Sequence, residues 1–290
     1  MPIKDLENKT YFGFTDKELA SLETVYRDGL LDGQVALVSG GGTGIGKAIA
    51  FLFARLGADV MLCGRREEPL QETVKQLEEL GANADYMAMS IREPDAVSEL
   101  VAATWERFGR LDTLINNAGG QFAKPALDIS PKGWQAVIDT NLTGTWYMTQ
   151  ACARQWVKQE QPGCVVNIIL DYFRGMPTIV HSAASRAAVD NMSRTLAVEW
   201  SQYKIRINSI APGAIESNGF NQYPRPLLKG FYNANPMREL GTVQDIAEGC
   251  VYLAGAAGNY ITGETLVIDG GGQLWGETWL TDQPDHFKPV

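Results

Sequence analysis

The fold is decided by VALVSGGGTGIGKAI, residues 35–49 of a chain of 290. Residues 35–38 are uncharged and rich in β-branched side chains, which is typical of a strand buried on both faces of a parallel sheet. Five glycines follow within residues 40–47, and an apolar pattern with helical period starts at Gly46. Such a strand, tight turn and helix direct unpaired N–H groups and the positive end of a helix dipole at one point. The stretch therefore predicts a cradle for a dinucleotide diphosphate.

Strands and helices alternate along the rest of the chain. Runs typical of buried strands lie at residues 35–38, 58–63, 83–89, 111–116, 164–170, 205–210 and 265–269, and helical patterns separate them. Each parallel pair of strands needs a crossover connection, which the intervening helix supplies. We therefore predict a single α/β domain with a Rossmann-like, doubly wound sheet of about seven parallel strands.

The boundaries of this domain follow from composition. We expect an N-terminal extension at 1–30, the Rossmann domain at 31–275 and a C-terminal tail at 276–290, because no run of Gly, Ser or Pro divides the middle. Residues 214–240 lack a clean period and should form a loop with short helices over the substrate crevice. The alternative is that this segment contacts another copy of the chain in an oligomer. The loop's apolar residues, which suit an apolar ligand, are Phe220, Tyr223, Leu227, Leu228, Phe231 and Tyr232.

Composition also excludes several classes of partner. A formal net charge of −9 argues against binding to nucleic acid or to an anionic membrane. No apolar run is long enough for a signal peptide or a membrane span, so we expect a soluble, cytoplasmic protein. The four cysteines have no CxxC spacing and should be buried, reduced thiols. Only two histidines are present, so we expect no histidine-rich metal site.

The residues at the end of the second predicted strand indicate whether the cofactor is NAD or NADP. An acidic residue at that position holds the adenosine 2′-hydroxyl of NAD. Here the sequence is Cys-Gly-Arg-Arg at residues 63–66, so Arg65 and Arg66 can receive the 2′-phosphate of NADP(H). The alternative is that both arginines lie in solvent at the start of a helix. The helix dipole disfavours positive charge at that position.

Four motifs together resemble those of the short-chain dehydrogenase/reductase family. They are the GxxxGxG loop at Gly40, Gly44 and Gly46, NNAG at 116–119, Asn141 in TNLTG, and the pair Pro212 and Gly213. The resemblance implies a nicotinamide cofactor. It also implies that the cofactor contacts Gly40, Thr43, Gly44, Ile45, Gly46, Arg65, Arg66, Ile91, Asn117, Ala118, Gly119, Arg186, Pro212, Gly213 and Ile215.

The active site departs from the family pattern of a tyrosine four residues before a lysine. HSAASRAAVDN places Ser182 at the tyrosine and Arg186 at the lysine, and NIILDYFRG has no serine where the family has one. Arg186 can bind the nicotinamide ribose, but its pKa is too high for proton donation near pH 7. The proton must come from elsewhere, and His181 or a water held by Asn141 are minor candidates. The catalytic candidates are Asn141, Asp171, Tyr172, Ser182 and Arg186.

Two of these candidates have structural alternatives. Tyr172 can be a rim aromatic that packs on the substrate, and Ser182 can be a helix N-cap.

The strings HSAASRAAVDNMSRTLAVEW and YITGETLVIDGG resemble one branch of the family. That branch contains peroxisomal trans-2-enoyl-CoA reductase, 2,4-dienoyl-CoA reductases and bacterial citronellol/citronellal dehydrogenases. In the dienoyl reductases, the tyrosine and serine that replace the usual group map onto Tyr172 and Ser182. The resemblance implies an NADP(H)-dependent reductase of an enoyl-CoA C=C bond. The alternatives are a citronellol/citronellal-type alcohol dehydrogenase and a catalytically degenerate nucleotide-binding subunit.

The resemblance also implies the partners. We expect an apolar small-molecule substrate, either an acyl-CoA or a terpenoid. We further expect a homotetramer or homodimer that pairs through the long helices at 134–158 and 182–203.

Overall fold

A computed structural model of the protein describes residues 12–222, 230–274, 280 and 282–288. Seven strands form one sheet in the order β3-β2-β1-β4-β5-β6-β9, and every neighbouring pair is parallel. The predicted α/β fold is confirmed, and each predicted strand is present with ends that differ by a residue or two. The strands are β1 (Val35–Ser39), β2 (Asp59–Gly64), β3 (Ala84–Ala88), β4 (Thr113–Asn116), β5 (Gly163–Ile168), β6 (Ile205–Pro212) and β9 (Thr265–Ile268).

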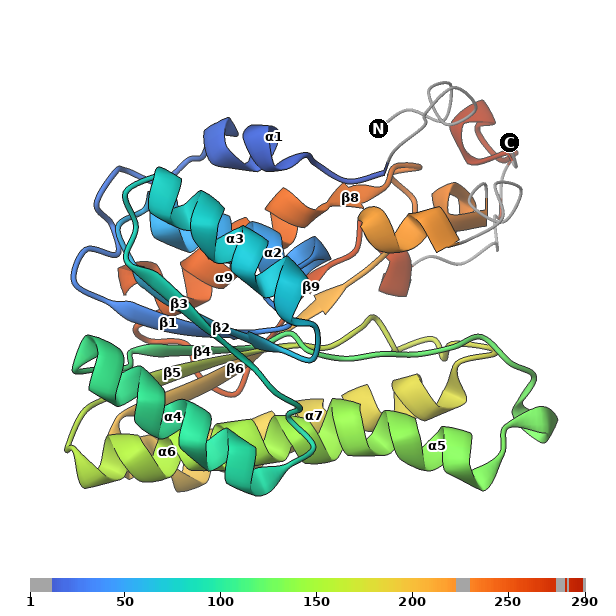
Figure 1. Cartoon of the computed structure of the whole chain (residues 1–290). Coiled ribbons are helices and arrows are strands. Elements are labelled where there is room, and N and C mark those ends of the chain that lie inside the picture. Colours follow the sequence, from blue (N-terminus) through green and yellow to red (C-terminus); the bar gives the residue numbers. More distant parts are fainter. Residues whose placement is uncertain (1–11, 223–229, 275–279, 281, 289–290) are drawn as a thin grey trace.

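Helices cover both faces of this sheet (Figure 1). One face carries α2 (Gly44–Arg55), α3 (Glu67–Glu79) and α9 (Val243–Ala254). The other face carries α4 (Pro94–Phe108), α5 (Pro131–Ile138), α6 (Thr145–Lys158) and α7 (Val180–Glu199). The order of strands reverses at β1 and β4, so a crevice opens beyond their carboxyl ends, as in other doubly wound sheets.

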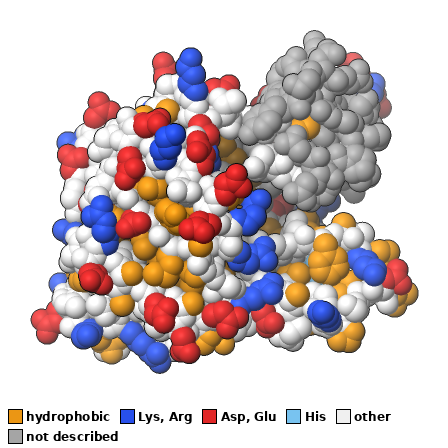
Figure 2. Space-filling model, viewed as in Figure 1, with side chains coloured by type: hydrophobic (Ala, Val, Ile, Leu, Met, Phe, Trp, Pro, Cys, Tyr) orange, Lys and Arg blue, Asp and Glu red, His pale blue; other side chains and the backbone are white. Residues whose placement is uncertain are grey.

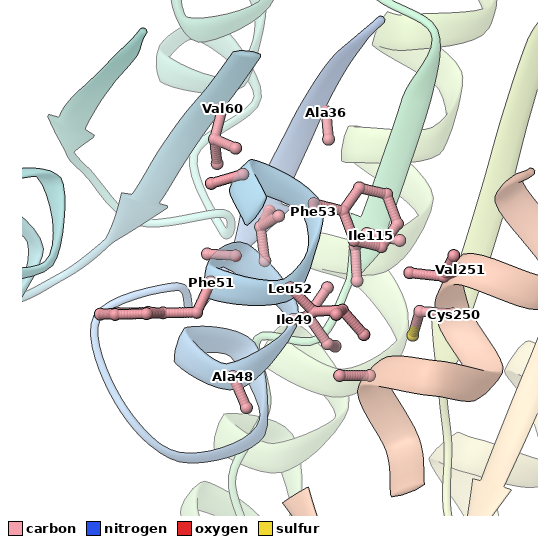
Figure 3. Packing of buried hydrophobic residues seen from close by; sticks show 14 of the residues in the cluster. Ala36, Ala48, Ile49, Phe51, Leu52, Phe53, Val60, Ile115, Cys250 and Val251 are labelled. Carbon is pink, nitrogen blue, oxygen red and sulfur yellow. The ribbon is translucent and has the colours of Figure 1, made fainter. Parts of the chain in front are cut away.

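The core explains why α2 lies where it does. Its residues Ile49, Leu52 and Phe53 are buried and pack with Ile115 of β4 and Val251 of α9 (Figure 3). This packing fixes the start of α2, and with it the glycine turn, against the end of β1. The four cysteines are all buried and free, as predicted, and burial raises the pKa of each thiol.

The long helix predicted at 134–158 is not continuous. α5 ends at Ile138, a π-helical segment covers Asp139–Gly144, and α6 follows. The apolar period continues through this segment, so the sequence pattern does not reveal the change. Such π segments often occur at functional sites. This one carries Asn141, which is buried.

The segment at 214–240 is held at both of its ends. β7 (Ile215–Glu216) pairs in parallel with β8 (Gly241–Thr242), apart from the main sheet. A 3₁₀ turn follows β7 at Asn218–Gln222. The predicted loop residues Tyr223, Leu227 and Leu228 lie outside the described residues.

The described part of the N-terminal extension packs on the domain. It contains α1 (Asp16–Ser21), whose Leu19 is buried in the main core cluster. Over the described residues, no helix has the length and apolar character needed to cross a membrane.

Candidate active site

The glycine turn after β1 has no room for side chains at its functional positions. Gly40 and Gly44 adopt φ values of +69° and +58°, which L side chains rarely adopt. A Cβ at Gly46 would lie 2.3 Å from the carbonyl oxygen of Gly40 and 2.4 Å from Asn117 Nδ2. The same amide of Asn117 donates to the carbonyls of Ser39 and Gly40 at 3.0 and 3.3 Å. The bare backbone at the start of α2 therefore fits a diphosphate.

A pocket of about 340 Å³ lies over this turn. The predicted cofactor residues that line it are Gly40, Thr43, Ile45, Arg65, Arg66, Ile91, Asn117, Ala118 and Gly119. Gly44 and Gly46 shape the turn beneath them. The structure thus brings nine of the predicted cofactor residues, from four different strand ends, to one place.

Arg65 and Arg66 follow β2 at the rim of this pocket. Both are exposed, and among the described residues neither forms a salt bridge or a side-chain hydrogen bond. Figure 2 shows Lys and Arg side chains gathered beside the hollow between the main body and the lobe that carries α5. Arg92, which our sequence analysis missed, also lines the pocket. It donates to Thr140 Oγ1 at 2.6 Å and to the carbonyl of Ala136 at 2.8 Å.

A second pocket, of about 400 Å³, continues from the first. Ile45, Asn117 and Gly119 line both pockets, so the two form one crevice. The remaining predicted cofactor residues and four of the five catalytic candidates line the second pocket, as do Phe220 and Phe231 of the loop. These predicted residues are Asn141, Asp171, Ser182, Arg186, Pro212, Gly213 and Ile215.

Asn141, Ser182 and Arg186 form a connected group at the junction. Asn141 Nδ2 donates to the carbonyl of Gly120 at 3.1 Å and to Ser182 Oγ at 3.4 Å. Asn141 Oδ1 accepts from the amide of Gly120 at 2.9 Å, and the Asn141 carbonyl accepts from Arg186 at 3.4 Å. Burial lowers the pKa of Arg186 to about 10, so its guanidinium stays charged near pH 7. A Cβ at Gly119 would lie 2.0 Å from Arg186 Nη2, so a side chain at this position would displace the cation.

Ser182 is not a helix N-cap. α7 begins at Val180 with Ile179 as its N-cap, so Ser182 lies inside the first turn. Its side chain is buried and faces Asn141 and the second pocket. The neighbouring His181 is also buried, and its ring packs edge-on against Phe122 at 4.4 Å between centroids. His181 does not line the second pocket, so this minor candidate lies behind the site.

Asp171 faces a second carboxyl group, that of Asp269. Both residues line the second pocket. Their Oδ2 atoms lie 3.4 Å (Asp171) and 3.5 Å (Asp269) from the point that a Cβ atom at residue 272 would occupy. Burial, and then the charge of Asp269, raise the pKa of Asp171. Within the described part of the chain, Asp171 Oδ1 is buried without a hydrogen-bond partner. Our sequence analysis did not single out Asp269, although its place at the end of a predicted strand was a usable signal.

Asp269 itself is fixed by the glycine turn that follows β9. Its carboxylate accepts from the amides of Gly271 and Gln273, each at 2.7 Å. The position of the second carboxyl group is therefore set by backbone groups and does not depend on a flexible side chain.

Tyr172 does not point into the crevice. Its hydroxyl donates to Asp190 Oδ2 at 2.5 Å, and Tyr172 is absent from the described lining of the second pocket. Asp190 is buried and also accepts from Arg194 and Thr265. Burial, and then the hydrogen bond to Asp190, raise the pKa of Tyr172 to about 12. This placement disfavours both earlier readings of Tyr172, as a proton donor to substrate and as an aromatic that packs on it.

A doubly wound parallel sheet, a glycine turn without room for side chains and a crevice at the strand ends together define a dinucleotide-binding protein. Comparison with known proteins gives the family. Residues 40–273 match the family model described as Enoyl-(Acyl carrier protein) reductase. The chain belongs to the short-chain dehydrogenase/reductase family, as its motifs predicted.

The names of the similar proteins indicate two kinds of reaction. A "Probable 2,4-dienoyl-CoA reductase" of Bacillus subtilis (strain 168) is 39% identical over 259 residues, which cover 88% of this chain and 100% of the relative. The peroxisomal 2,4-dienoyl-CoA reductase of Danio rerio is 34% identical, covering 93% and 90%. The structure of the citronellol catabolism dehydrogenase AtuB of Pseudomonas aeruginosa PAO1 superposes with a TM-score of 0.78 at 35% identity, covering 86% and 99%.

Proposed function

We propose that this protein is an NADP(H)-dependent reductase of the C=C bond of enoyl-CoA or dienoyl-CoA thioesters. The observation that carries the proposal is the position of Asp171 beside Asp269 in a largely apolar pocket next to the cofactor crevice. Reduction of a C=C bond needs a proton delivered to carbon, and a carboxyl group with a raised pKa is a suitable donor. The names of the relatives support the same class of substrate.

NADP(H) is proposed as the cofactor because Arg65 and Arg66 stand where NAD-specific enzymes have a carboxylate. Both side chains are exposed at the pocket rim and available for a phosphate. When bound, NADPH supplies the hydride.

The chain's own residues then have distinct roles. Arg186 binds the ribose hydroxyls of the cofactor. Asn141 donates to Ser182 Oγ, so the hydroxyl proton of Ser182 stays free to donate to the thioester oxygen as enolate charge develops on it. Asp171 gives its proton to the substrate carbon, and the charge of Asp269 favours the protonated form of Asp171 before the transfer.

The test is oxidation of NADPH, followed by absorbance, with crotonyl-CoA, a longer 2-enoyl-CoA and 2,4-hexadienoyl-CoA. Turnover of at least one thioester, with loss of the C=C bond confirmed by mass spectrometry, is expected. Absence of turnover with all three, in a protein that binds NADPH, would contradict the proposal and favour a nucleotide-binding subunit without catalysis.

A second candidate is a citronellol/citronellal-type dehydrogenase, because the AtuB structure is similar over most of the chain. That reaction transfers a proton to or from oxygen. The usual tyrosine is absent, and only the hydroxyl of Ser182 stands in its place. Reduction of NADP⁺ with citronellol, set against the thioester assays, separates the two candidates.

We also infer that copies of the chain pair through α6 and α7 to form a homodimer or homotetramer. A groove on this face is lined by Trp146, Val157, Leu196, Trp200 and Tyr203, and Val157 is 41% exposed. Light scattering after chromatography, with Val157→Glu as the disrupting variant, tests this pairing. The cytoplasmic location expected from the sequence stays a prediction.

A further inference from the structure

The N-terminal segment touches the base of the loop at 214–240. The amide of Gly13 donates to Glu216 Oε1 of β7 at 3.0 Å, and Glu216 is buried. Gly13 has a φ of +90°, and a Cβ there would lie 3.2 Å from the backbone nitrogen of Asn218. Figure 1 shows the chain before α1 running to the region of β8, the partner strand of β7. Residues far apart in the sequence are therefore in close contact where the loop begins.

Phe12 supports the wall of the substrate pocket from behind. It is 1% exposed and belongs to a small apolar cluster with Phe220, Tyr232 and Leu240, all from the loop. The rings of Phe12 and Phe220 meet edge-on at 6.0 Å, and Phe220 stacks on Phe231 at 5.2 Å. Phe220 and Phe231 line the second pocket, whereas Phe12 does not. Among the described residues, Phe12 is therefore connected to the pocket through these two rings.

The other end of the segment is fixed to the nucleotide-binding part of the domain. Thr15 and Glu18 form a capping box at the start of α1. Asp16 forms a salt bridge with Lys47 of α2 and accepts from Gln76 of α3 at 2.6 Å. Residues 12–16 thus connect the loop to α2, which begins at the glycine turn, and to α3.

We propose that residues 12–16 form a clasp that positions the substrate loop, with Phe12 as a positioning residue for the apolar part of the substrate. The clasp holds β7 and Phe220 against the body of the domain, so the pocket wall is formed before substrate arrives. A wall that is already ordered lowers the entropic cost of binding. The identity of the substrate rests on the proposed function, whereas the clasp itself does not.

The experiment compares two full-length variants that each remove a buried N-terminal side chain. Phe12→Ala removes the contact with the loop. Leu31→Ala is the matched control, because Leu31 is equally buried and its amide bonds to the carbonyl of Leu56 at the C-terminal end of α2, the end remote from the glycine turn and the loop. We expect both variants to lose thermal stability, since each leaves a cavity. Only Phe12→Ala should alter the loop.

The first readout is hydrogen–deuterium exchange, which needs no substrate. We expect faster exchange in peptides that cover residues 214–220 for Phe12→Ala and unchanged exchange there for Leu31→Ala. Equal exchange in the two variants would overturn the clasp. Altered exchange together with absence of thioester turnover would leave the clasp supported and contradict the proposed function.

The second readout is kinetic. Phe12→Ala should raise the KM for 2,4-hexadienoyl-CoA about tenfold, equivalent to about 1.4 kcal/mol, with the KM for NADPH unchanged. Phe12→Leu, which restores apolar volume, should recover most of this loss. A parallel rise in both KM values would indicate general destabilisation and overturn the proposal. Should Phe12→Ala fail to fold, Phe12→Val, which removes less of the side chain, carries the same comparison.

Discussion

The hydroxyl of Tyr172 donates a hydrogen bond to the buried carboxylate of Asp190 and not to the substrate pocket. This contact links the loop after β5 to α7. It also removes a tyrosine from the set of proton donors available to an active site that already lacks the family tyrosine.

We therefore expect Tyr172→Phe to retain activity. The loss in kcat should be less than about threefold, or about 0.7 kcal/mol in the activation barrier. Stability should fall by about 1–3 kcal/mol, because Asp190 loses a donor in a buried site. Steady-state kinetics and thermal denaturation measure the two effects. A loss of activity above a hundredfold, with the fold intact by circular dichroism, would return Tyr172 to the catalytic group.

Ser182→Ala should behave in the opposite way. Ser182 lines the pocket and is paired with Asn141, so its removal takes away a donor to the thioester oxygen. We expect kcat to fall about a hundredfold with little change in stability. Ser185→Ala is the matched control, since Ser185 is buried one turn away and bonds to the carbonyl of Ser182. Similar rates for both variants would exclude a role for the Ser182 hydroxyl.

The carboxyl pair predicts a specific pH dependence. Asp171 must be protonated to donate, and its pKa is raised by burial and by Asp269. Activity should therefore fall as pH rises through this raised pKa. Asp269→Asn removes the neighbouring charge, which lowers the pKa of Asp171, so the alkaline limb should move to lower pH. A pH–rate profile of kcat for both proteins measures the shift, and an unmoved limb would count against the pair.

Asp171→Asn extends this argument to stability. A carboxyl group with a raised pKa binds its proton more tightly in the folded state, so its favourable contribution is lost as pH rises from the unfolded pKa through the folded one. The neutral amide avoids this loss. We expect Asp171→Asn to lower kcat by about 10²–10⁴-fold and yet to raise the melting temperature at neutral pH. A variant that is both inactive and less stable would point to a structural role.

The sheet could be predicted from the sequence because strands buried on both faces leave uncharged, β-branched runs. The cofactor crevice could be predicted because parallel strands bring their carboxyl ends to one edge. The π-helical segment at Asn141 could not, since its apolar spacing is that of a continuous helix. The direction of Tyr172 could not either, because it depends on Asp190, which lies on α7 and is fixed by Thr265 of β9.

The cofactor preference predicts a selective effect at the end of β2. Arg65→Ala should weaken NADPH binding by about ten- to a hundredfold, the range expected for loss of a hydrogen bond to a charged group, and leave NADH binding almost unchanged. Arg107→Ala is a suitable control, because Arg107 is a surface arginine paired with Asp85 outside the crevice. Fluorescence titration with each nucleotide measures both affinities. Equal losses for NADPH and NADH would refute the phosphate role.

The last prediction concerns Gly119 and Arg186. A methyl group at residue 119 would overlap the guanidinium of Arg186, which is buried and charged. Gly119→Ala should therefore displace this cation and lower kcat, although residue 119 itself has no polar side chain. Gly120→Ala is the control, because no atom lies within 4 Å of its Cβ position. Arg186→Lys keeps the charge and should retain more activity than Arg186→Met. If Gly119→Ala and Gly120→Ala have the same kcat, the position of Arg186 does not limit the reaction.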